Sequence, residues 1–193
     1  MAPNSSSRIR SLGSADLERC MAMSTQANWN QTVHDWEYLF EHALTYGVEL
    51  PDLGLIGTTV AWPISSQHAW INMVLVDESC RGQGLAKTMF ERCLDDLKTK
   101  GMISFLDATE MGSRVYRKFG FFESTELVRM KGRAEPLREI KPAADTVIAL
   151  SNEAAAEVIS RDEQVLGGNR GSFFKRLIND RPELSRCHLG TDG

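Results

Sequence analysis

The spacing of apolar residues changes along the first half of the chain from a helical period to the pattern of strands. A helix is predicted from Ser14, a favourable N-cap, to about Met23. A second helix is predicted from about Asn30 to Leu44, where apolar residues recur at helical spacing. We interpret this stripe as core packing, with the alternative that some of its aromatic residues face a ligand cleft. Strands are predicted at residues 9–12, 48–50, 55–62 and 70–76.

The middle of the chain has the pattern of one βαβ unit. The largely apolar run Trp70–Val76 predicts a buried central strand, and the polar turn Asp77–Arg81 leads into Gly82-Gln83-Gly84. A long helix is predicted at about Leu85–Lys98, and Ile103–Leu106 is predicted as the next buried strand. Strand, glycine turn, helix and strand in this order imply parallel pairing with a right-handed crossover.

Beyond this unit, the predicted elements are short and are separated by turn residues and prolines. A short helix is expected at about Gly112–Phe119, followed by a turn at Gly120 and a strand at Phe121–Met130. Pro136 and Pro142 mark a linker. The later expectations are helices at about Ser151–Arg161 and Ser172–Asp180, a turn at Gly167-Gly168-Asn169, a stop at Pro182 and a loop at Leu189–Gly193.

Composition narrows the class of protein. The 193 residues are 42% hydrophobic and 25% charged, which is ordinary for a globular protein. The net charge of −4 argues against a nucleic-acid partner, and no apolar run approaches the roughly 20 residues of a membrane span. The cysteines are too far apart for a metal site or a disulfide scaffold, so we expect reduced thiols and a cytoplasmic location. They are Cys20, Cys80, Cys93 and Cys187.

The glycine turn before the long helix carries the chemical signal. Glycines allow the main chain to approach a ligand closely, and a helix start presents unpaired N–H groups with a partial positive charge. Arg81-Gly82-Gln83-Gly84-Leu85-Ala86 therefore has the properties of a phosphate or pyrophosphate site, to which Arg81 adds a charge. The alternative is a tight turn that binds nothing, which is the commoner role of an isolated Gly-x-Gly.

Three phosphate-binding patterns can be compared with this loop. The Walker loop would need glycine where Arg81 and Ala86 stand, and the dinucleotide fingerprint would need glycine at Lys87. The pattern Arg/Gln-x-x-Gly-x-Gly/Ala fits completely, with Arg81, Gly84 and Ala86. This pattern resembles the coenzyme-A loop of the GNAT family of N-acetyltransferases.

Three further segments strengthen the resemblance, which covers roughly Ile9 to Gly132. Residues 73–77 look like the strand that leads into the loop, and Tyr116 with Gly120-Phe121 looks like the second signature of the family. Leu106-Asp107-Ala108-Thr109 resembles a subgroup. The resemblance implies an α/β fold with a mixed, mostly antiparallel sheet, a central βαβ unit and helices on both faces.

The resemblance also implies acetyl-CoA as the cofactor. Main-chain N–H groups of Gly82, Gln83, Gly84, Leu85 and Ala86 would hold the pyrophosphate, beside Arg81. The main chain of Val74, Leu75 and Val76 would pair with the pantetheine arm, because the fourth and fifth strands splay apart in the family. A strand N–H would polarise the acetyl carbonyl while an amine attacks it.

Tyr116 is the expected general acid for the thiolate, with a structural tyrosine as the alternative. Asn72 stands where many members carry a glutamate base; its amide cannot accept a proton usefully at neutral pH but can hold a water. Asp107 and Glu110 are alternative bases, although a loop or capping role suits Asp107 better. No histidine has metal-ligand spacing, so no metal is expected.

The expected organisation is an N-acetyltransferase domain at residues 1–133, a linker at 134–150 and the helical start of an incomplete second domain at 151–193. The subgroup carries a second α/β domain, of which only two helices and no sheet are expected here. A non-catalytic acyl-CoA sensor or interaction module is the alternative function. The expected acceptor is a small-molecule or peptide amine, recognised near Trp29, Trp36 and Tyr38, and a homodimer is left open.

Overall fold

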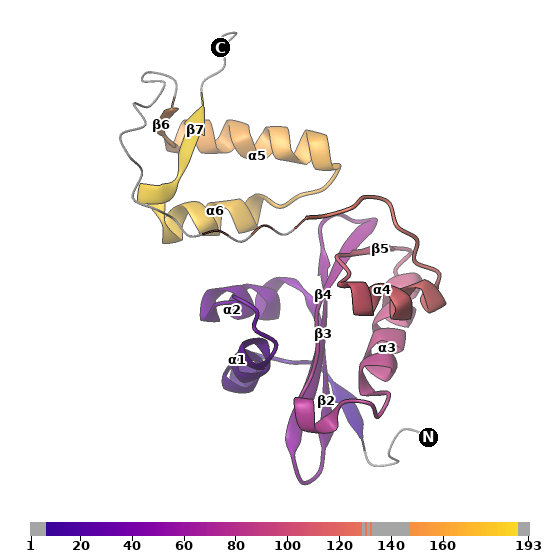
Figure 1. Ribbon diagram of the computed structural model, residues 1–193. Helices are drawn as coiled ribbons and strands as arrows, with labels where there is room; N and C mark the ends of the chain where they lie inside the picture. Colours follow the sequence, from indigo (N-terminus) through magenta and orange to yellow (C-terminus); the bar gives the residue numbers. More distant parts are fainter. Residues whose placement is uncertain (1–6, 129, 131, 133–146, 189–193) are drawn as a thin grey trace. The chain divides into compact units, whose positions relative to one another are not determined.

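A computed structural model describes residues 7–128, 130, 132 and 147–188 of the chain. The chain divides into two compact units, Met1–Ala108 and Thr109–Gly193 (Figure 1).

The first unit is built on a mixed sheet of five strands among the described residues. In spatial order these are β1 (Arg8–Arg10), β2 (Leu44–Leu50), β3 (Gly54–Pro63), β4 (His68–Val76) and β5 (Ile103–Leu106). The three pairings from β1 to β4 are antiparallel, and β4 pairs with β5 in parallel. The mostly antiparallel sheet with one βαβ unit is therefore confirmed.

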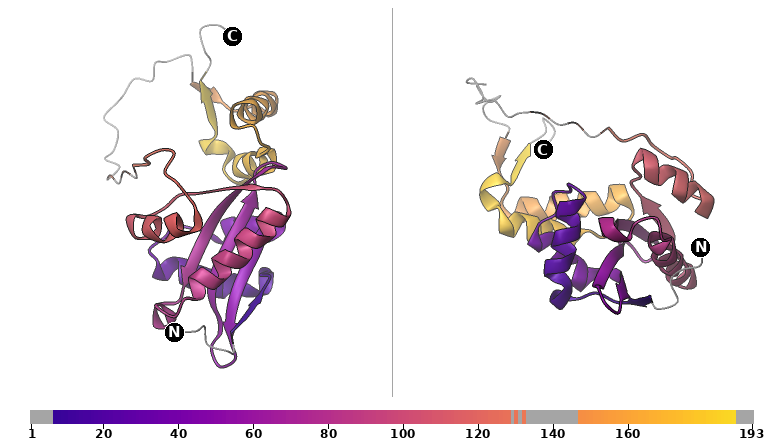
Figure 2. Two further views of the ribbon diagram at one scale, coloured as in Figure 1. Left: turned by 90° about the vertical axis from the view of Figure 1, so that its right-hand side faces the viewer. Right: turned by 60° about the horizontal axis from the view of Figure 1, so that its bottom comes forward.

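Helices cover both faces of this sheet, as predicted. The short η1 (Ser14–Asp16), α1 (Leu17–Gln26) and α2 (Val33–His42) lie on one face. The long α3 (Leu85–Thr99), which follows the short η2 (Glu78–Cys80), lies on the other face. In the left view of Figure 2, α3 lies across the near face of the sheet.

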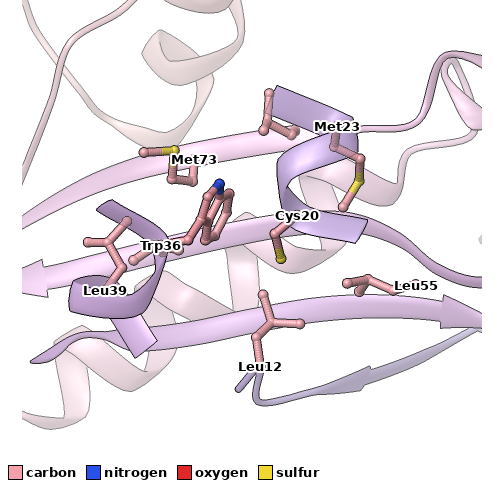
Figure 3. Packing of buried hydrophobic residues seen from close by; sticks show 9 residues of the cluster. Leu12, Cys20, Met23, Trp36, Leu39, Leu55 and Met73 are labelled. Carbon is pink, nitrogen blue, oxygen red and sulfur yellow. The ribbon is translucent and has the colours of Figure 1, made fainter. Parts of the chain in front are cut away.

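Each face of the sheet has its own apolar cluster. Under α1 and α2, the fully buried Trp36 packs among Cys20, Leu39, Val60 and Met73 (Figure 3). Trp36 also donates its indole N–H to Ser24 Oγ at 3.0 Å, so its polar atom is satisfied in the core. The core interpretation of this helical stripe therefore describes Trp36 correctly.

A second cluster lies on the α3 face. It consists of Val48, Ile56, Cys80, Leu85 and Met89. Three of the five residues come from α3 and from η2 just before it, so packing on the sheet fixes the place where α3 begins.

The second predicted helix ends earlier than its apolar spacing suggests. Thr32 caps α2 with a side-chain contact to the backbone N–H of Asp35, but Ala43 is already extended and Leu44 begins β2. Leu44 of β2 pairs with Ala61 of β3, which lies 17 positions further along the chain. Long-range strand pairing thus takes Leu44 away from a helix that local spacing would continue.

The two parallel strands are less buried than predicted. In β4, buried residues alternate with half-buried ones instead of forming a fully buried run. In β5, Ile103 is 57% and Phe105 38% exposed. The reason is that β5 has β4 as its only neighbour in the sheet that the described residues form.

The strand predicted at Phe121–Met130 is wrong for residues 121–128, which form no strand, and residue 129 lies outside the described residues. Phe122, Leu127 and Val128 are exposed, so the β-favouring side chains of this segment have no sheet to pack on.

The second unit begins with α4 (Glu110–Tyr116) and η3 (Arg117–Phe119), and Gly120 ends this helix with φ +87°. It continues with β6 (Val147–Ala149), α5 (Asn152–Leu166), α6 (Gly171–Asp180), η4 (Pro182–Leu184) and β7 (Arg186–His188). The predicted turn at residues 167–169 separates α5 from α6, and Pro182 follows α6, as expected. Pro136 and Pro142, which mark the predicted linker, lie outside the described residues, and so does the loop predicted at 189–193.

The expectation that this tail has helices but no sheet is wrong. Strands β6 and β7 pair antiparallel, with Ile148 opposite Cys187. The helices are joined by Arg170, which donates to both carboxylate oxygens of Asp162 at 3.1 and 2.5 Å, and Ile159 is buried beside Gly171. Strands of three residues leave too short a pattern to be predicted from alternation.

Candidate coenzyme and active site

The pairing between β4 and β5 ends before β4 does, and we call the unpaired stretch of β4 the opening in the sheet. The parallel pairing of the two strands runs from His68 with Ile103 to Ile71 with Leu106 and ends there. Residues 72–76 continue β4 beside β3, but they have no partner in β5. One edge of the main chain at Val74, Leu75 and Val76 is therefore left without a strand inside the sheet. An unpaired strand edge is a template for main-chain hydrogen bonding.

A bulge marks the point at which the opening begins. Between the register pairs Val60–Asn72 and Thr58–Leu75, β4 contributes two residues opposite one on β3. Met73 takes φ +49°, which is unusual for a non-glycine residue, and Thr58 Oγ1 donates to its carbonyl oxygen at 2.7 Å. A bulge redirects the backbone polar groups of its strand, so the peptides next to Met73 differ in direction from a regular ladder.

The glycine loop presents free amides at the end of β4. Gly82 and Gly84 have φ of +78° and +80°, and a Cβ at either position would meet no atom within 4 Å. Within the part of the chain that the structure describes, the N–H groups of residues 82–86 donate to no protein acceptor. Thr88 is the residue whose N–H first bonds back, to Gly84 O at 3.1 Å. Free donors at the start of a 15-residue helix suit an anion.

Arg81 is held by the loop that it belongs to. Its Nε donates to the carbonyl oxygen of Val76 at 3.1 Å, and its Nη1 lies 3.3 Å from Glu78 Oε1. The side chain is 52% exposed, so its remaining N–H groups face solvent. The structure thus adds a bracing contact to the charge predicted for Arg81.

Asp77 joins β4 to the loop. Its side chain is buried, and its Oδ1 accepts hydrogen bonds from Ser79 N at 3.0 Å and Ser79 Oγ at 2.6 Å. Arg19 of α1 donates to the other oxygen at 2.5 Å. The Ser79 hydroxyl, followed by Arg19, lowers the pKa of Asp77 to about 2. Sequence reasoning did not identify this residue pair, because 58 positions separate the two residues.

Asn72 lies at the inner end of the opening. It is opposite Val60 in register, so its side chain lies on the same face as Val60, the face covered by α1 and α2. Its Oδ1 is buried and has no hydrogen-bond partner among the described residues. A buried carbonyl oxygen without a partner is a place for a water or a ligand donor.

Aromatic residues flank Asn72, and of these the sequence analysis singles out Tyr38 alone. Trp62 and Trp70 are register partners on the same face, and Trp70 stacks on Phe105 of β5 with ring centres 5.9 Å apart. Tyr38 meets Trp62 edge-on at 5.8 Å. Register pairing across three strands brings these rings together, and sequence spacing gives no sign of it.

Tyr116 and Glu110 belong to the second unit, and Asp107 is next to the last residue of the first. Tyr116 is the last residue of α4, and its ring centre lies 6.2 Å from that of Phe121. Burial raises the pKa of Tyr116. Asp107 and Glu110 are both exposed, and Glu110 lies 3.4 Å from Arg114. The structure therefore brings the predicted coenzyme residues together at the end of β4 and the start of α3, and it places Tyr116 in the second unit.

The described residues contain no cluster with the composition of a metal site, and three of their cysteines are buried. No three histidine, cysteine, aspartate or glutamate side chains among them come close enough to hold a metal ion. Cys20, Cys80 and Cys93 are buried free thiols, and burial raises the pKa of Cys20 and Cys93 to about 12. None of the helices described has both the length and the apolar character that crossing a membrane requires.

Comparisons with solved structures identify the fold. A probable acetyltransferase from methicillin-resistant Staphylococcus aureus superimposes with a TM-score of 0.57 and 19% identity, over 65% of this chain and 99% of the other. A predicted acetyltransferase from Clostridium acetobutylicum, solved with acetyl-CoA, gives 0.55 and 16%, over 65% and 96%. AAC(6′)-Iy in complex with a CoA bisubstrate analogue gives 0.54 and 19%, over 66% and 99%.

Sequence comparison adds the family. No curated protein matches the chain significantly. The profile of the acetyltransferase (GNAT) family matches residues 14–121, which include the opening in the sheet, the glycine loop and Tyr116. The chain therefore belongs to the GNAT family of acetyltransferases.

Proposed function

We propose that the protein transfers an acetyl group from acetyl-CoA to a primary amine, by direct attack of the amine in a ternary complex. The observation that carries this proposal is that two neighbouring stretches of main chain have N–H or C=O groups without a hydrogen-bond partner among the described residues. The free N–H groups of residues 82–86 follow, after η2, the same strand whose residues 72–76 lack a partner in β5. One stretch suits a pyrophosphate and the other suits an amide-containing arm.

The residues present fit coenzyme A. Gly82 and Gly84 leave open space where a side chain would stand, so phosphate oxygens can approach the amides closely. The edge of Val74–Val76 can exchange hydrogen bonds with the two amides of pantetheine, as in strand addition. When bound, acetyl-CoA supplies an activated acetyl group and a thiolate leaving group. The solved relatives with acetyl-CoA and with a CoA analogue support this choice of ligand.

We assign proton removal to a water held by Asn72. The unpartnered Oδ1 of Asn72 can accept from a water or from the acceptor's ammonium, which must lose a proton before the neutral amine attacks, but the amide itself is not a base at neutral pH. An N–H of the redirected backbone next to Met73 can donate to the acetyl carbonyl oxygen and stabilise the developing negative charge.

We assign protonation of the leaving thiolate to Tyr116. Its raised pKa keeps the phenol protonated at neutral pH, so it can donate its proton to a thiolate whose ordinary pKa is about 8.5. The acceptor is proposed to be a small-molecule or peptide amine. The rings of Trp62, Trp70 and Phe105, on the face shared with Asn72, favour an acceptor with an apolar or aromatic portion beside its amine.

A non-catalytic acyl-CoA sensor is the second candidate. One observation favours it: the buried position at the opening carries Asn72 and not a carboxylate, so the site holds no strong base. Binding of the coenzyme without acetylation of any amine in a broad panel would decide for the sensor.

Calorimetric titration with acetyl-CoA, and separately with ATP, tests the coenzyme. We expect acetyl-CoA to bind and ATP to bind weakly, because ATP lacks the pantetheine arm that the unpaired edge of β4 is proposed to bind. Thiol release in the presence of small amines and short peptides then tests turnover. Tight ATP binding without acetyl-CoA binding would contradict the proposal.

The glycine loop allows a variant with a matched control. Gly84 and Gly101 stand at opposite ends of α3, with φ of +80° and +67°, and neither has an atom within 4 Å of a new Cβ. Alanine at either position should cost roughly 1–2 kcal/mol of stability through backbone strain. Only Gly84→Ala should also lower acetyl-CoA affinity, because its methyl would enter the space left for phosphate. Equal affinities in Gly84→Ala and Gly101→Ala would place the pyrophosphate elsewhere.

A further inference from the structure

Helix α1 is hydrogen-bonded to the chain segment that leads into the glycine loop. Arg19 donates from Nε to the carbonyl oxygen of Leu55 at 2.8 Å and from Nη2 to Asp77 Oδ2 at 2.5 Å. About two turns further along α1, Gln26 Oε1 accepts from the backbone N–H of Glu78 at 3.3 Å. Two side chains of one helix therefore hold two consecutive residues just after β4.

Asp77 passes this constraint on to the loop. Its backbone N–H donates to Ile56 O at 2.8 Å, which fixes Asp77 to β3. Its Oδ1 accepts from Ser79 N and Oγ and thereby caps η2, the short helix that ends one residue before Arg81. Cys80 at the end of η2 is 3% exposed and packs in the cluster under α3. Each residue from Asp77 to Arg81 is therefore held by a hydrogen bond or by packing, up to the free amides that begin at residue 82.

We propose that Arg19 is a positioning residue for coenzyme binding, which it aids by holding Asp77 and thus the glycine loop in the binding geometry. The identification of the ligand as coenzyme A rests on the proposed function. Asp77 is 7% exposed, and a buried carboxylate needs a cation close by. Without Arg19, Asp77 keeps its bonds to Ser79 but loses the charged partner that fixes it against α1. The amides of residues 82–86 bind an anion well only if they are already oriented.

The chain offers a matched control for a purely structural role. Arg10 of β1 makes the same kind of bridge, to Asp16 at 2.6 Å and to Glu49 at 2.7 Å. Its side chain is 28% exposed, compared with 39% for Arg19. Arg10 thus joins η1 to β2, as Arg19 joins α1 to β3 and to Asp77 just after β4, but none of the bonds of Arg10 reaches the glycine loop.

The experiment compares Arg19→Ala with Arg10→Ala in the full chain. Three quantities are measured for each variant: the melting temperature, the Kd for coenzyme A by calorimetry, and the hydrogen-exchange rates of a peptide covering residues 78–86. Both variants should melt at lower temperature than the wild type. Arg19→Ala should also weaken coenzyme A binding by about tenfold and speed exchange in the loop, while Arg10→Ala should change neither.

Two further variants separate charge from packing. Arg19→Lys restores a cation facing Asp77 and should recover most of the lost affinity. Asp77→Asn keeps an oxygen for Ser79 but loses the charge that Arg19 needs, so it should weaken binding as Arg19→Ala does. The double variant Arg19→Ala/Asp77→Asn should then bind no more weakly than either single variant, since both remove the same contact.

The outcomes distinguish this inference from the proposed function. If Arg19→Ala lowers the melting temperature while both the Kd and loop exchange stay at wild-type values, Arg19 has a structural role only and the inference is wrong. If the wild type does not bind coenzyme A, the proposed function fails. Loop exchange still decides the positioning role in that case: faster exchange in Arg19→Ala than in Arg10→Ala supports it, and equal rates refute it.

Discussion

At the scale of single residues, Tyr116 carries the most specific catalytic prediction. Tyr116→Phe removes the phenolic proton while keeping the ring that packs 6.2 Å from Phe121. We expect kcat to fall by roughly 10²-fold or more with little change in acetyl-CoA affinity, because the proton is needed only as the thiolate leaves. Steady-state kinetics together with calorimetric titration check this split. Unchanged turnover in the variant would remove Tyr116 from the mechanism.

The raised pKa of Tyr116 also predicts the pH profile. Burial disfavours the charged phenolate, so the acid form persists to higher pH than in a free tyrosine. The alkaline fall in kcat should therefore lie above about pH 10, the ordinary pKa of tyrosine. The rate should be followed up to the pH at which the protein itself unfolds. A fall centred near pH 8 would assign the acid to another group.

Asn72 gives a prediction in which stability and activity change in opposite directions. Its Oδ1 is buried without a partner, so Asn72→Leu removes an unsatisfied polar atom and should leave stability unchanged or raise it by about 1 kcal/mol. The same change removes the oxygen proposed to hold water and should lower kcat by about tenfold. Urea denaturation and turnover are measured on the same preparations. A loss of stability would show that the amide has a structural role.

At the scale of secondary structure elements, the sequence predicted the order of the βαβ unit but not how far its strands pair. Ile103–Leu106 was identified as a strand from its apolar pattern, and the structure has it with the same bounds. The pairing ends at Ile71, two residues before the bulge at Met73, and no local sequence signal marks the positive φ of Met73. The proposed function depends most on the unpaired edge of β4. The hydrophobic pattern does not predict this feature, and only the family resemblance implies it.

The packing of α3 against the sheet can be tested at Gly57. A Cβ at Gly57 would lie 2.8 Å from Met89 Cε, 2.9 Å from Val48 Cγ1 and 3.0 Å from the carbonyl oxygen of Leu75. Gly57→Ala should therefore push α3 from β3 and cost roughly 1–3 kcal/mol. Gly13→Ala is the control, because Gly13 has extended backbone and no atom within 4 Å of a new Cβ. Chemical denaturation of both variants checks this; equal stabilities would mean that α3 adjusts without cost.

At the scale of the whole molecule, the limits of sequence reasoning have a common physical origin. Contacts between residues close in sequence, such as the cap that Thr32 makes with Asp35, follow from local pattern. The bridge from Arg19 to Asp77 and the pairing of β6 with β7 join segments far apart along the chain. A single sequence contains no spacing rule for such contacts, since they depend on the finished fold.

Acid stability depends on these long-range contacts. Hydrogen bonds from Ser79 and Arg19 lower the pKa of Asp77 from 3.8 to about 2, and Arg10 lowers the pKa of Asp16. In this range the unfolded chain binds more protons than the folded chain, so unfolding free energy rises with pH. The contribution of Asp77, roughly 1–2 kcal/mol after allowance for the solvent around Arg19, is complete above about pH 4 and lost toward pH 2.

Urea denaturation of the wild type and Asp77→Asn between pH 2 and 7 measures this contribution. The two curves of unfolding free energy against pH should be separated above about pH 4 and converge as the pH approaches 2, because a protonated Asp77 has lost the same charge as the asparagine. Glu91→Gln is the control, since Glu91 and Lys87 form an exposed pair at 3.6 Å, and its curve should follow the wild type throughout. Curves for Asp77→Asn that run parallel to the wild type down to pH 2 would show that the carboxylate is not held as the structure describes.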